Sequence, residues 1–379
     1  MKDHSLEVHG CHTYDATGAI SPAICLSATF RHPRFGESTG YDYGRVANPT
    51  RESLEKTVAL LERGGRSWAL SSGMAAVQLV FSLLSAGDHV LMSEDLYGGT
   101  VRLAEEVFAD YGITFEYVDV RDLALVGKRM RPETKLVFIE TPSNPMMQIS
   151  DIAALSALAH ENGALLAVDN TFLSPHFQKP LTLGADIVLH SGTKYLCGHN
   201  DVIAGFLVLK DATSAQAKRI ELLAKSAGPN LSALDSWLML RSIKTLGVRV
   251  ERQAENALAI AQWLGTLPEV TEVLYPGLAD HPGYALQQKQ ASGAGGMISF
   301  KVRSAELAKA ALGKLHLIAF AESLGGVETL LTYPIAQTHA EMPAALLKRT
   351  GLDDKLLRLS VGIEDVEDLK ADLQQALQG

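Results

Sequence analysis

Short, uniformly apolar runs alternate with longer segments of mixed polarity through the first half of the chain. The apolar runs are residues 89–92, 114–118, 136–139, 165–168, 187–189 and 205–209. Most of them are apolar throughout, and β-branched residues are frequent, which is typical of strands buried on both faces. The intervening segments have the length of helices. The pattern therefore predicts a mainly parallel sheet that is covered by helices.

Capping residues predict where three of the covering helices begin. Thr50 is a suitable N-cap for a helix through residues 54–61, and a second helix is expected to begin near Ser72. Asp151 is expected to cap a third helix, which Gly163 ends. This third helix joins two of the predicted strands, as the helix of a βαβ unit does.

The chain divides into three parts by pattern. Residues 1–48 lack a clear period and are rich in Gly, Pro, His and Tyr, so we expect an arm that lies over a neighbouring subunit. Residues 49–245 are expected to form the main α/β domain, and residues 246–379 a smaller domain.

The smaller domain has strand and helix signals of its own. Residues 296–300 and 356–360 are apolar runs with the length of strands, and helical segments lie between and after them. The stretch 233–264 contains few helix-breaking residues, so one long helix is expected to link the two domains. The second domain is therefore predicted to have an α+β architecture.

Composition and charge exclude several classes of protein. The chain has 379 residues, of which 47% are hydrophobic, and its formal net charge is −9, which argues against nucleic acid and anionic membranes as partners. The N-terminus has no secretory signal, and no apolar stretch approaches the length of a bilayer. We therefore expect a soluble cytoplasmic protein.

The cysteines give no sign of a disulfide framework or a metal site. Cys11, Cys25 and Cys197 are an odd number and lie far apart, without the CxxC spacing of zinc sites. They are expected to be reduced thiols, and no metal is predicted.

Polar residues that follow the buried strands are candidates for chemistry. Glu140, Asp169 and His190 each lie at the carboxyl end of a predicted strand, where parallel sheets bind their ligands. Lys194 follows the last of these, with Ser191 close before it. By position alone, Lys194 would be a solvated surface residue. A lysine and an aspartate at neighbouring strand ends are also able to hold pyridoxal phosphate, through its aldehyde and its ring nitrogen.

Three other segments could assist such a cofactor. Ser72 and Gly73 lie at a predicted helix start, where free amides favour a phosphate group, although Ser72 would equally serve as an N-cap alone. Tyr97 precedes two glycines and could stack on a flat ring, or simply pack. Tyr43 and Arg45 in the arm could reach a phosphate.

Together and in this order, these segments resemble the Cys/Met-metabolism family of pyridoxal-phosphate enzymes, of fold type I. The similarity is densest from Asp169-Asn170-Thr171-Phe172 through Ser191-Gly192-Thr193-Lys194-Tyr195-Leu196, and it extends from the arm to Arg358-Leu359-Ser360-Val361-Gly362. The resemblance implies a mostly parallel seven-stranded sheet between helices and a smaller C-terminal domain. It also implies pyridoxal 5′-phosphate as the cofactor, and a homo-oligomer that is at least a dimer and is expected to be a tetramer of two active dimers.

The resemblance also implies a role for each candidate residue. Lys194 would bind the cofactor's aldehyde, Asp169 its ring nitrogen, and Tyr97 would stack on the ring and act as a base. The implied cofactor-binding set is Tyr43, Arg45, Ser72, Gly73, Met74, Tyr97, Asn144, Asp169, Thr171, Ser191, Thr193 and Lys194, with Tyr43 and Arg45 supplied by the neighbouring subunit and Asn144 touching the ring oxygen O3′. The implied substrate-binding set is Arg358, which would bind the α-carboxylate, with Glu322, Ser323, Asp42 and Arg102.

Members of the family differ in the substrate carbon that loses its group. Glu322 resembles the acidic residue of members that act at Cγ, and Gly99 stands where methionine γ-lyases usually have a cysteine. These residues, with Asp42, favour a cystathionine γ-synthase that uses O-acylhomoserine and cysteine. Cystathionine γ-lyase, β-lyase and O-acylhomoserine sulfhydrylase are the alternatives. Gly44 and Cys197 depart from the usual family pattern and weaken the choice among these activities.

A nucleotide-binding Rossmann protein is the alternative from another class, because its order of strands and helices would look similar. The chain lacks GxGxxG after its first strand and has no GxxxxGK[ST] motif. The sequence therefore favours the cofactor-dependent enzyme over a nucleotide-binding protein.

Overall fold

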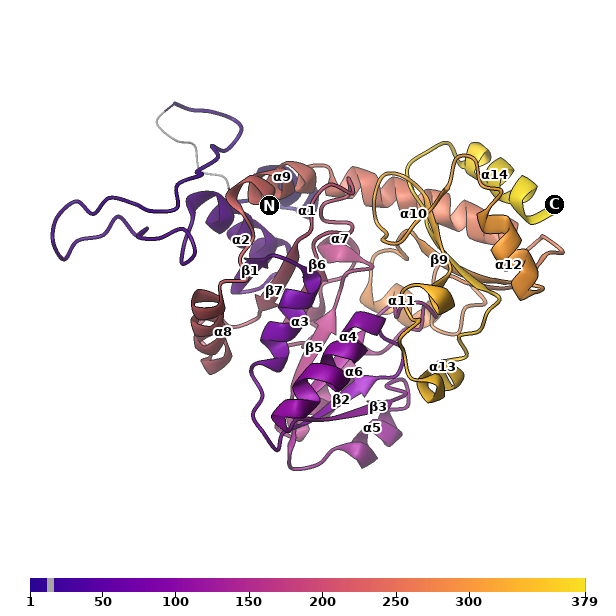
Figure 1. Ribbon diagram of the computed structural model, residues 1–379, viewed down its shortest axis with the longest axis horizontal. Helices are drawn as coiled ribbons and strands as arrows, with labels where there is room; N and C mark the ends of the chain where they lie inside the picture. The colour runs from indigo at the N-terminus through magenta and orange to yellow at the C-terminus, as the bar shows by residue number, and fades with distance from the viewer. Residues whose placement is uncertain (12–16, 379) are drawn as a thin grey trace.

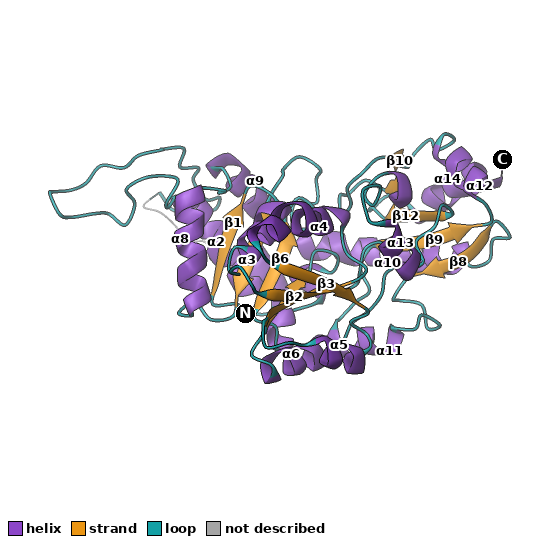
Figure 2. Cartoon of the chain, turned by 60° about the horizontal axis from the view of Figure 1, so that its bottom comes forward, coloured by secondary structure: helices purple, strands orange, loops and turns teal. Residues whose placement is uncertain are grey.

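A computed structural model describes residues 1–11 and 17–378, which form two sheets flanked by helices (Figure 1). The larger sheet lies in the N-terminal part of the chain and the smaller sheet in the C-terminal part (Figure 2). These two sheets fall on either side of the domain boundary expected at residue 245. Among the described residues, no helix is long and apolar enough to cross a membrane.

The larger sheet has seven strands in the order β1-β7-β6-β5-β4-β2-β3. From β6 to β3 all neighbours are parallel, whereas β7 runs antiparallel to both β6 and β1. Its strands are β1 (Arg66–Leu70), β2 (His89–Ser93), β3 (Thr114–Val118), β4 (Thr134–Glu140), β5 (Leu165–Asp169), β6 (Ile187–Ser191) and β7 (Gly205–Leu209). The mostly parallel α/β fold is therefore confirmed.

The six apolar runs all form strands, whereas the sequence pattern did not predict β1. Its residues Arg66 and Ser67 are polar, and Trp68 is followed by only two further apolar residues. The strand exists because it pairs antiparallel with β7 along its full length. The pairing with β7, which is distant in the sequence, therefore forms a strand that the local pattern of residues does not predict.

Helices cover both faces of the larger sheet, and their capping only partly follows the sequence prediction. Asn48, not Thr50, caps α2, because its side chain accepts the amides of Thr50 and Arg51 and Pro49 takes the first helical position. Ser72 and Asp151 cap their helices as predicted. The helices up to residue 264 are α1 (Asp3–His9), α2 (Pro49–Leu61), α3 (Gly73–Phe81), α4 (Gly98–Leu103), α5 (Leu123–Arg129), α6 (Ile152–Glu161), α7 (Ser174–Phe177), α8 (Ala215–Ala227), α9 (Ala233–Ile243) and α10 (Leu246–Leu264).

The prediction of a single long helix over 233–264 is wrong, because the helix is interrupted between α9 and α10. The buried Arg249 side chain donates to the carbonyl oxygen of Ser242 at 3.1 Å and to that of Tyr195 at 2.9 Å. A side chain from the next helix thus satisfies a carbonyl at the end of α9. This partner lies across the break, so helix propensity alone could not show it.

The smaller sheet has five strands in the order β10-β11-β12-β9-β8. The strands expected at 296–300 and 356–360 are confirmed as β9 and β12. The elements are β8 (Val270–Leu274), β9 (Met297–Val302), β10 (Ala319–Phe320), β11 (Leu330–Thr332), β12 (Leu356–Ser360), α11 (Tyr284–Gln290), α12 (Ala305–Leu312), α13 (Ala344–Thr350) and α14 (Val366–Gln378). The α+β architecture of this part of the chain is therefore present.

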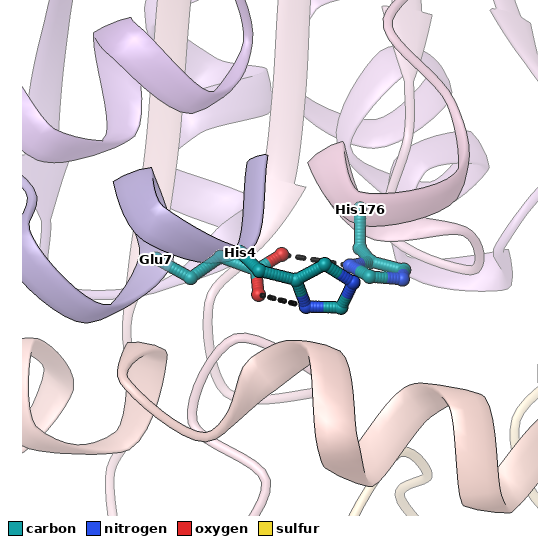
Figure 3. A group of neighbouring side chains, drawn as sticks. All are labelled: His4, Glu7 and His176. Atoms are coloured by element: carbon teal, nitrogen blue, oxygen red, sulfur yellow. Dashed lines mark hydrogen bonds and ion pairs between the residues drawn. The ribbon is translucent and has the colours of Figure 1, made fainter. Parts of the chain in front are cut away.

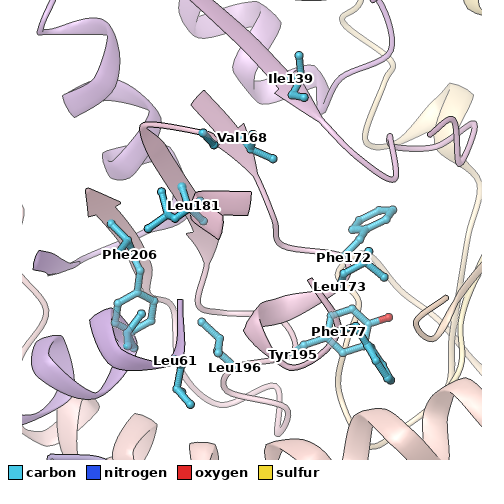
Figure 4. Close-up of a cluster of buried hydrophobic side chains, with 14 of the residues drawn as sticks. Leu61, Ile139, Val168, Phe172, Leu173, Phe177, Leu181, Tyr195, Leu196 and Phe206 are labelled. Atoms are coloured by element: carbon cyan, nitrogen blue, oxygen red, sulfur yellow. The ribbon is translucent and has the colours of Figure 1, made fainter. Parts of the chain in front are cut away.

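Apolar side chains form separate cores on the two faces of the larger sheet and a third core in the smaller domain. Part of the first core surrounds the segment after β5, where Phe172, Leu173 and Phe177 pack near Tyr195 and Leu196 (Figure 4). This core therefore fixes the loops that follow Asp169 and Lys194.

The N-terminal segment contains one helix that the sequence pattern did not predict. Helix α1 packs against α2 and α10, and its residues Leu6 and Glu7 are buried. Among the described residues, the segment from Thr17 to Asn48 has no helix or strand, and it projects away from the body (Figure 1). Phe35 and Leu26 are exposed there.

Candidate functional site

One cavity lies where the carboxyl ends of β4, β5 and β6 meet the first turn of α3 and residues of the smaller domain. Its volume is ≈ 270 Å³. Thirteen residues of the two sets implied by sequence line it: Ser72, Gly73, Met74, Tyr97, Asn144, Asp169, Thr171, Ser191, Thr193, Lys194, Glu322, Ser323 and Arg358. The fold thus brings together residues that are spread over almost 300 positions of the chain.

Lys194 is held in this cavity by a residue of the smaller domain. Its Nζ atom donates to Ser323 Oγ at 2.8 Å, and Ser323 has a φ of 90°, a backbone conformation that is strained for a residue with a side chain. Burial, with a smaller contribution from the nearby Arg358 charge, lowers the pKa of Lys194 to about 8. The fraction of neutral amine near physiological pH is therefore much larger than for an ordinary lysine, and the neutral amine is the form that acts as a nucleophile.

Asp169 ends β5 next to Glu140 of β4, its partner in the sheet register. Its carboxylate accepts the backbone amide of Thr171 at 3.0 Å and the hydroxyl of the same residue. Burial raises the pKa of Asp169, and the two Thr171 hydrogen bonds oppose this rise. Thr171 Oγ1 also accepts the amide of Ser191 at 2.9 Å. Thr171 therefore connects the ends of the two strands that carry Asp169 and the Lys194 loop.

Helix α3 begins against the end of β6, which creates a place for an anion. The first amides of any helix lack helical acceptors, and here they belong to Gly73 and Met74. A Cβ atom at Gly73 would lie 2.9 Å from Ser191 Cβ, and one at Gly205 would lie 1.9 Å from Ser72 O. Both glycines are therefore required for this close approach. The helix N-terminus and the hydroxyls of Ser191 and Thr193 suit a phosphate group.

Tyr97 precedes α4 and is fixed through its backbone. Its amide donates to Glu140 Oε2 at 3.1 Å. A Cβ atom at Gly99 would lie 2.4 Å from Tyr97 Cε1, and one at Gly98 would lie 2.4 Å from Thr338 O. Gly99 therefore leaves the space that the Tyr97 ring occupies, and Gly98 allows the close approach of the Thr338 backbone.

Arg358 is a buried guanidinium that no carboxylate of the described residues neutralises through an ion pair. Nη1 donates to Asn144 Oδ1 at 2.7 Å, and Nη2 donates to the carbonyl oxygen of Ser323 at 3.3 Å. Nε is buried and has no hydrogen-bond partner. Burial lowers the pKa of Arg358 to about 10, so the group remains cationic. A positive charge with a free donor is suited to binding a carboxylate.

Three further residues lie at the site, and the sequence pointed to only one of them, Glu140. Glu140 is a buried acid whose pKa burial, with the adjacent Asp169 charge, raises well above its usual value. Thr338 lines the cavity, and the ring Nε2 of His339 contacts the carbonyl oxygen of Asn144 at 3.0 Å. Its position at the end of a predicted strand already made Glu140 a candidate in the sequence, and β4 brings it to the cavity. Thr338 and His339 come from an irregular loop of the smaller domain and carried no such signal.

Four residues of the implied sets lie away from this cavity within the chain. Tyr43 and Arg45 are in the arm, where the Arg45 guanidinium lies 5.6 Å from the centroid of the Tyr43 ring. Asp42 is exposed beside them and accepts the hydroxyl of Ser38. Arg102 is exposed on α4 and pairs with Glu341. Any contact of these residues with a ligand in the cavity requires either another subunit or a different side-chain position.

The residues of the cavity fit pyridoxal phosphate. Lys194 supplies an amine of lowered pKa for the aldehyde, and Asp169 supplies an acid for the ring nitrogen. The first turn of α3 supplies amides for the phosphate. Burial of Asp169 disfavours its charge, and a cationic ring nitrogen would offset that cost. The donor set and its electrostatics thus match the three functional groups of this cofactor.

Comparison with known proteins gives the same assignment. The family described as Cys/Met metabolism PLP-dependent enzyme matches residues 4–378. A cystathionine γ-lyase of Bacillus subtilis (strain 168) is 47% identical over 379 residues, with 100% of both chains covered. Cystathionine β-lyase MetC of the same organism is 47% identical, with 96% of this chain and 93% of the relative covered.

Comparison with a solved structure shows that the fold is similar as well. The crystal structure of cystathionine γ-synthase from Xanthomonas oryzae pv. oryzae, in complex with aminoacrylate and cysteine, superposes with a TM-score of 0.96 at 41% identity, covering 100% of this chain and 98% of that chain. The similar proteins thus include both a cystathionine synthase and cystathionine lyases. The chain belongs to the Cys/Met-metabolism family of pyridoxal-phosphate-dependent enzymes.

Proposed function

We propose that this enzyme is a cystathionine γ-synthase, which replaces the acyl group of an O-acylhomoserine with the thiol sulfur of L-cysteine. The observation that carries the proposal is the charge arrangement of the cavity. Arg358 is a buried cation on one side, and Glu322 is an exposed carboxylate in the cavity lining. This arrangement can bind the α-carboxylate of one amino-acid substrate at Arg358 and the ammonium group of the other at Glu322 at the same time.

Glu322 favours cysteine over inorganic sulfide as the incoming thiol. The ammonium group of cysteine can pair with this carboxylate, whereas sulfide has no cationic group to bind there. Glu322 also lies close enough to Lys194 and Arg358 to affect the pKa of both, so a ligand bound to it lies near the reacting groups. This contact distinguishes a synthase from a sulfhydrylase.

The residues around the substrate would divide the work of the reaction. Pyridoxal phosphate, when bound, withdraws electrons from the substrate α-carbon. Arg358 would orient the α-carboxylate of the substrate. Asp169 would stabilise the positive charge of the cofactor's ring nitrogen. The amine of Lys194, with a pKa of about 8, moves protons at the α-carbon and the β-carbon. In the overall exchange the C–O bond at Cγ breaks, a C–S bond forms, and the acyl group leaves as a carboxylate.

The arm would complete the cofactor site of a neighbouring subunit. Tyr43 and Arg45 lie outside the chain's own cavity and are solvent-accessible. Although the Arg45 guanidinium donates to the carbonyl oxygen of Lys225, it has further donors for a phosphate bound by another chain. Arg45 is a suitable phosphate ligand because its guanidinium donates several hydrogen bonds. The active unit would then be at least a dimer, and a tetramer would join two such dimers.

Cystathionine γ-lyase is the second candidate, because a relative with that name is 47% identical over the full length of both chains. Its substrate, cystathionine, would place the same two charged ends on Arg358 and Glu322. The charge arrangement supports chemistry at Cγ for both candidates. The two differ in whether free cysteine enters or leaves.

Rate measurements with the two substrates test this proposal. The purified enzyme is given O-acetyl- or O-succinylhomoserine with cysteine in one assay and cystathionine alone in another. Cystathionine formation is expected to exceed the release of cysteine, ammonia and 2-oxobutanoate. A faster cleavage of cystathionine than its formation would contradict the synthase and support the lyase.

A variant with an uncharged side chain tests the role of Glu322. Glu322→Gln is expected to raise KM for cysteine about 10-fold while leaving the rate with sulfide within about twofold, since one charge-assisted contact is lost. The exposed Glu328, six positions further along, gives the matched control Glu328→Gln. An equal loss with cysteine and sulfide would remove the discriminating role from Glu322.

A further inference from the structure

One buried carboxylate near the cavity has no part in the chemistry described above. Asp95 is 3% exposed and lies in the connection between β2 and α4, two residues before Tyr97. It does not line the cofactor cavity. Burial raises the pKa of Asp95 to about 6, and hydrogen bonds from Ser143 and Met146 oppose this rise. At pH 8 the group is therefore an anion removed from water, a costly state that requires hydrogen-bond partners.

Two hydrogen-bond donors to the Asp95 side chain come from the loop that follows β4. Asp95 Oδ2 accepts the hydroxyl of Ser143 and, at 3.2 Å, the backbone amide of Met146. The loop is also closed on itself, because the amide of Ser143 donates to the carbonyl oxygen of Gln148 at 3.0 Å and the amide of Gln148 donates to Ser143 Oγ at 2.9 Å. Asn144 lies between the two residues that Asp95 holds, so Asp95 fixes the backbone on both sides of it.

Asn144 connects this loop with the residue that is expected to bind the substrate carboxylate. Its Oδ1 accepts Arg358 Nη1 at 2.7 Å, and its carbonyl oxygen contacts Nε2 of the buried His339 at 3.0 Å. Arg358 belongs to β12 and His339 to the loop before α13, so both contacts join the cofactor domain to the smaller domain. The position of the Asn144 side chain therefore helps to set the direction of the Arg358 guanidinium.

We propose that Asp95 is a positioning residue for the α-carboxylate of the substrate, and that it acts through Asn144 on Arg358. The inference rests on the role proposed above for Arg358. Recognition of a carboxylate by a guanidinium depends on the direction of its paired donors. A loop released from Asp95 would let Asn144 move and would leave Arg358 less well oriented. Loss of Asp95 should therefore weaken substrate binding more than it slows the chemical step.

Binding of a non-reacting analogue tests this inference directly. L-2-Aminobutyrate has an α-carboxylate but no group that can leave from Cγ, and its binding to the holoenzyme is followed at pH 8 through the visible absorption of the cofactor. Asp95→Ala is expected to raise its Kd about 10-fold, since two donors of the loop lose their acceptor. Asp95→Asn keeps an acceptor oxygen and should raise Kd by less than about threefold. This partial rescue is expected only if the hydrogen bonds of Asp95 are what matters.

Steady-state kinetics provides a second measurement on the same variants. Asp95→Ala should raise KM for O-acylhomoserine or cystathionine about 10-fold and leave kcat within about threefold, as expected when binding is lost without loss of the reacting groups. Ser143→Ala removes the hydroxyl that Asp95 accepts and should raise Kd about fivefold. It tests the same contact if Asp95→Ala does not fold. Because both changes act on one loop, the double variant should raise Kd by less than the product of the two single effects.

Glu7 provides a matched control, because it is a buried carboxylate with the same kinds of partner. It accepts one side-chain donor, Nδ1 of His176 at 2.7 Å (Figure 3), and one backbone amide, that of Gly247 at 3.2 Å. Neither Glu7 nor His176 lines the cofactor cavity. Glu7→Ala is expected to lower Tm, as Asp95→Ala does, and to leave the Kd of L-2-aminobutyrate within about twofold.

The result with Arg358→Lys separates a failure of this inference from a failure of the proposed function. If Arg358→Lys raises Kd whereas Asp95→Ala and Ser143→Ala leave it unchanged, Asp95 does not position Arg358 and the inference is wrong. If Arg358→Lys also leaves Kd unchanged, the proposed role of Arg358 is wrong, and the inference with it. An equal rise of Kd in Glu7→Ala and Asp95→Ala would show that Asp95 only stabilises the fold.

Discussion

The cavity and the N-terminal arm are both assigned to one cofactor by sequence, yet they differ in how far one chain completes them. The cavity is enclosed by two domains, and its key side chains already have partners, as Lys194 has Ser323 and Arg358 has Asn144. The arm projects from the body with its apolar residues exposed: Phe35 is fully exposed, and Leu26 is 74% exposed. One region is organised before any ligand arrives, and the other lacks a covering surface.

This difference shows what each region requires. The cavity residues are ordered by strand ends and buried cores, which a single chain can build. The arm carries apolar surface that isolated chains seldom leave exposed, and such surface is typical of contact with another chain. Changes in the cavity should therefore act within one subunit, whereas changes in the arm should act on its neighbour.

The largest effect is expected from removal of the cavity amine. Lys194→Ala should lower activity roughly 1000-fold or more, because the proton-transfer group is lost, and should abolish the visible absorption of covalently bound cofactor. Lys210→Ala removes an exposed lysine that directly follows β7 and provides the control. A Lys194→Ala enzyme that keeps its colour and activity would exclude Lys194 as the cofactor-binding residue.

A smaller effect is expected from a change at the carboxylate site. Arg358→Lys keeps the charge but loses the paired donor geometry, so KM should rise roughly 30-fold, about 2 kcal/mol. Arg303→Lys, at an exposed position of the smaller domain, should leave KM within about twofold. Steady-state kinetics measures both KM values. An unchanged KM in Arg358→Lys would show that another residue binds the α-carboxylate.

The arm should give an effect that depends on its neighbour. Arg45→Ala is expected to weaken cofactor affinity about 10-fold, because a charge-assisted contact to phosphate is lost. Co-expressing it with Lys194→Ala, which retains a normal arm, should restore one of the two sites of each mixed dimer, roughly half of the normal number.

The control for this complementation pairs two changes in the same cavity. Lys194→Ala co-expressed with Asp169→Ala should restore nothing, since each chain of the mixed dimer keeps a defective cavity of its own. Activity and bound cofactor are measured on mixed dimers isolated through two different tags. Equal activity of the Arg45→Ala/Lys194→Ala and Asp169→Ala/Lys194→Ala dimers would contradict the proposal that the arm acts on the neighbouring subunit.

The smallest expected effect is a shift along the pH axis. Only a neutral amine attacks an aldehyde, and burial lowers the pKa of Lys194 to about 8. The rate of cofactor uptake by the apoenzyme should therefore rise with pH, reach half its maximum near pH 8 and then level off. Glu322 raises this pKa, so Glu322→Gln should move the midpoint to lower pH. A rate that still climbs above pH 10 would indicate an ordinary exposed lysine.

Local sequence was sufficient where one segment carries its own signal. The runs that form β2 and β4 to β7 are apolar throughout, and Ser72 and Asp151 cap helices through their own side chains. Prediction failed where the partner is distant. Strand β1 depends on β7, the break before α10 depends on the Arg249 side chain, and α1 depends on packing against α2 and α10.

The amino-acid sequence was enough to identify the cofactor, because Asp169, Lys194 and the segments around them occur in the order and with the motifs of the Cys/Met-metabolism family. Tertiary structure decided which residues complete the site. It placed Ser323 against Lys194 and Asn144 against Arg358, and it left Arg102 outside the cavity. The reason is physical: strand ends follow from local apolar patterns, whereas contacts between elements depend on packing over the whole fold.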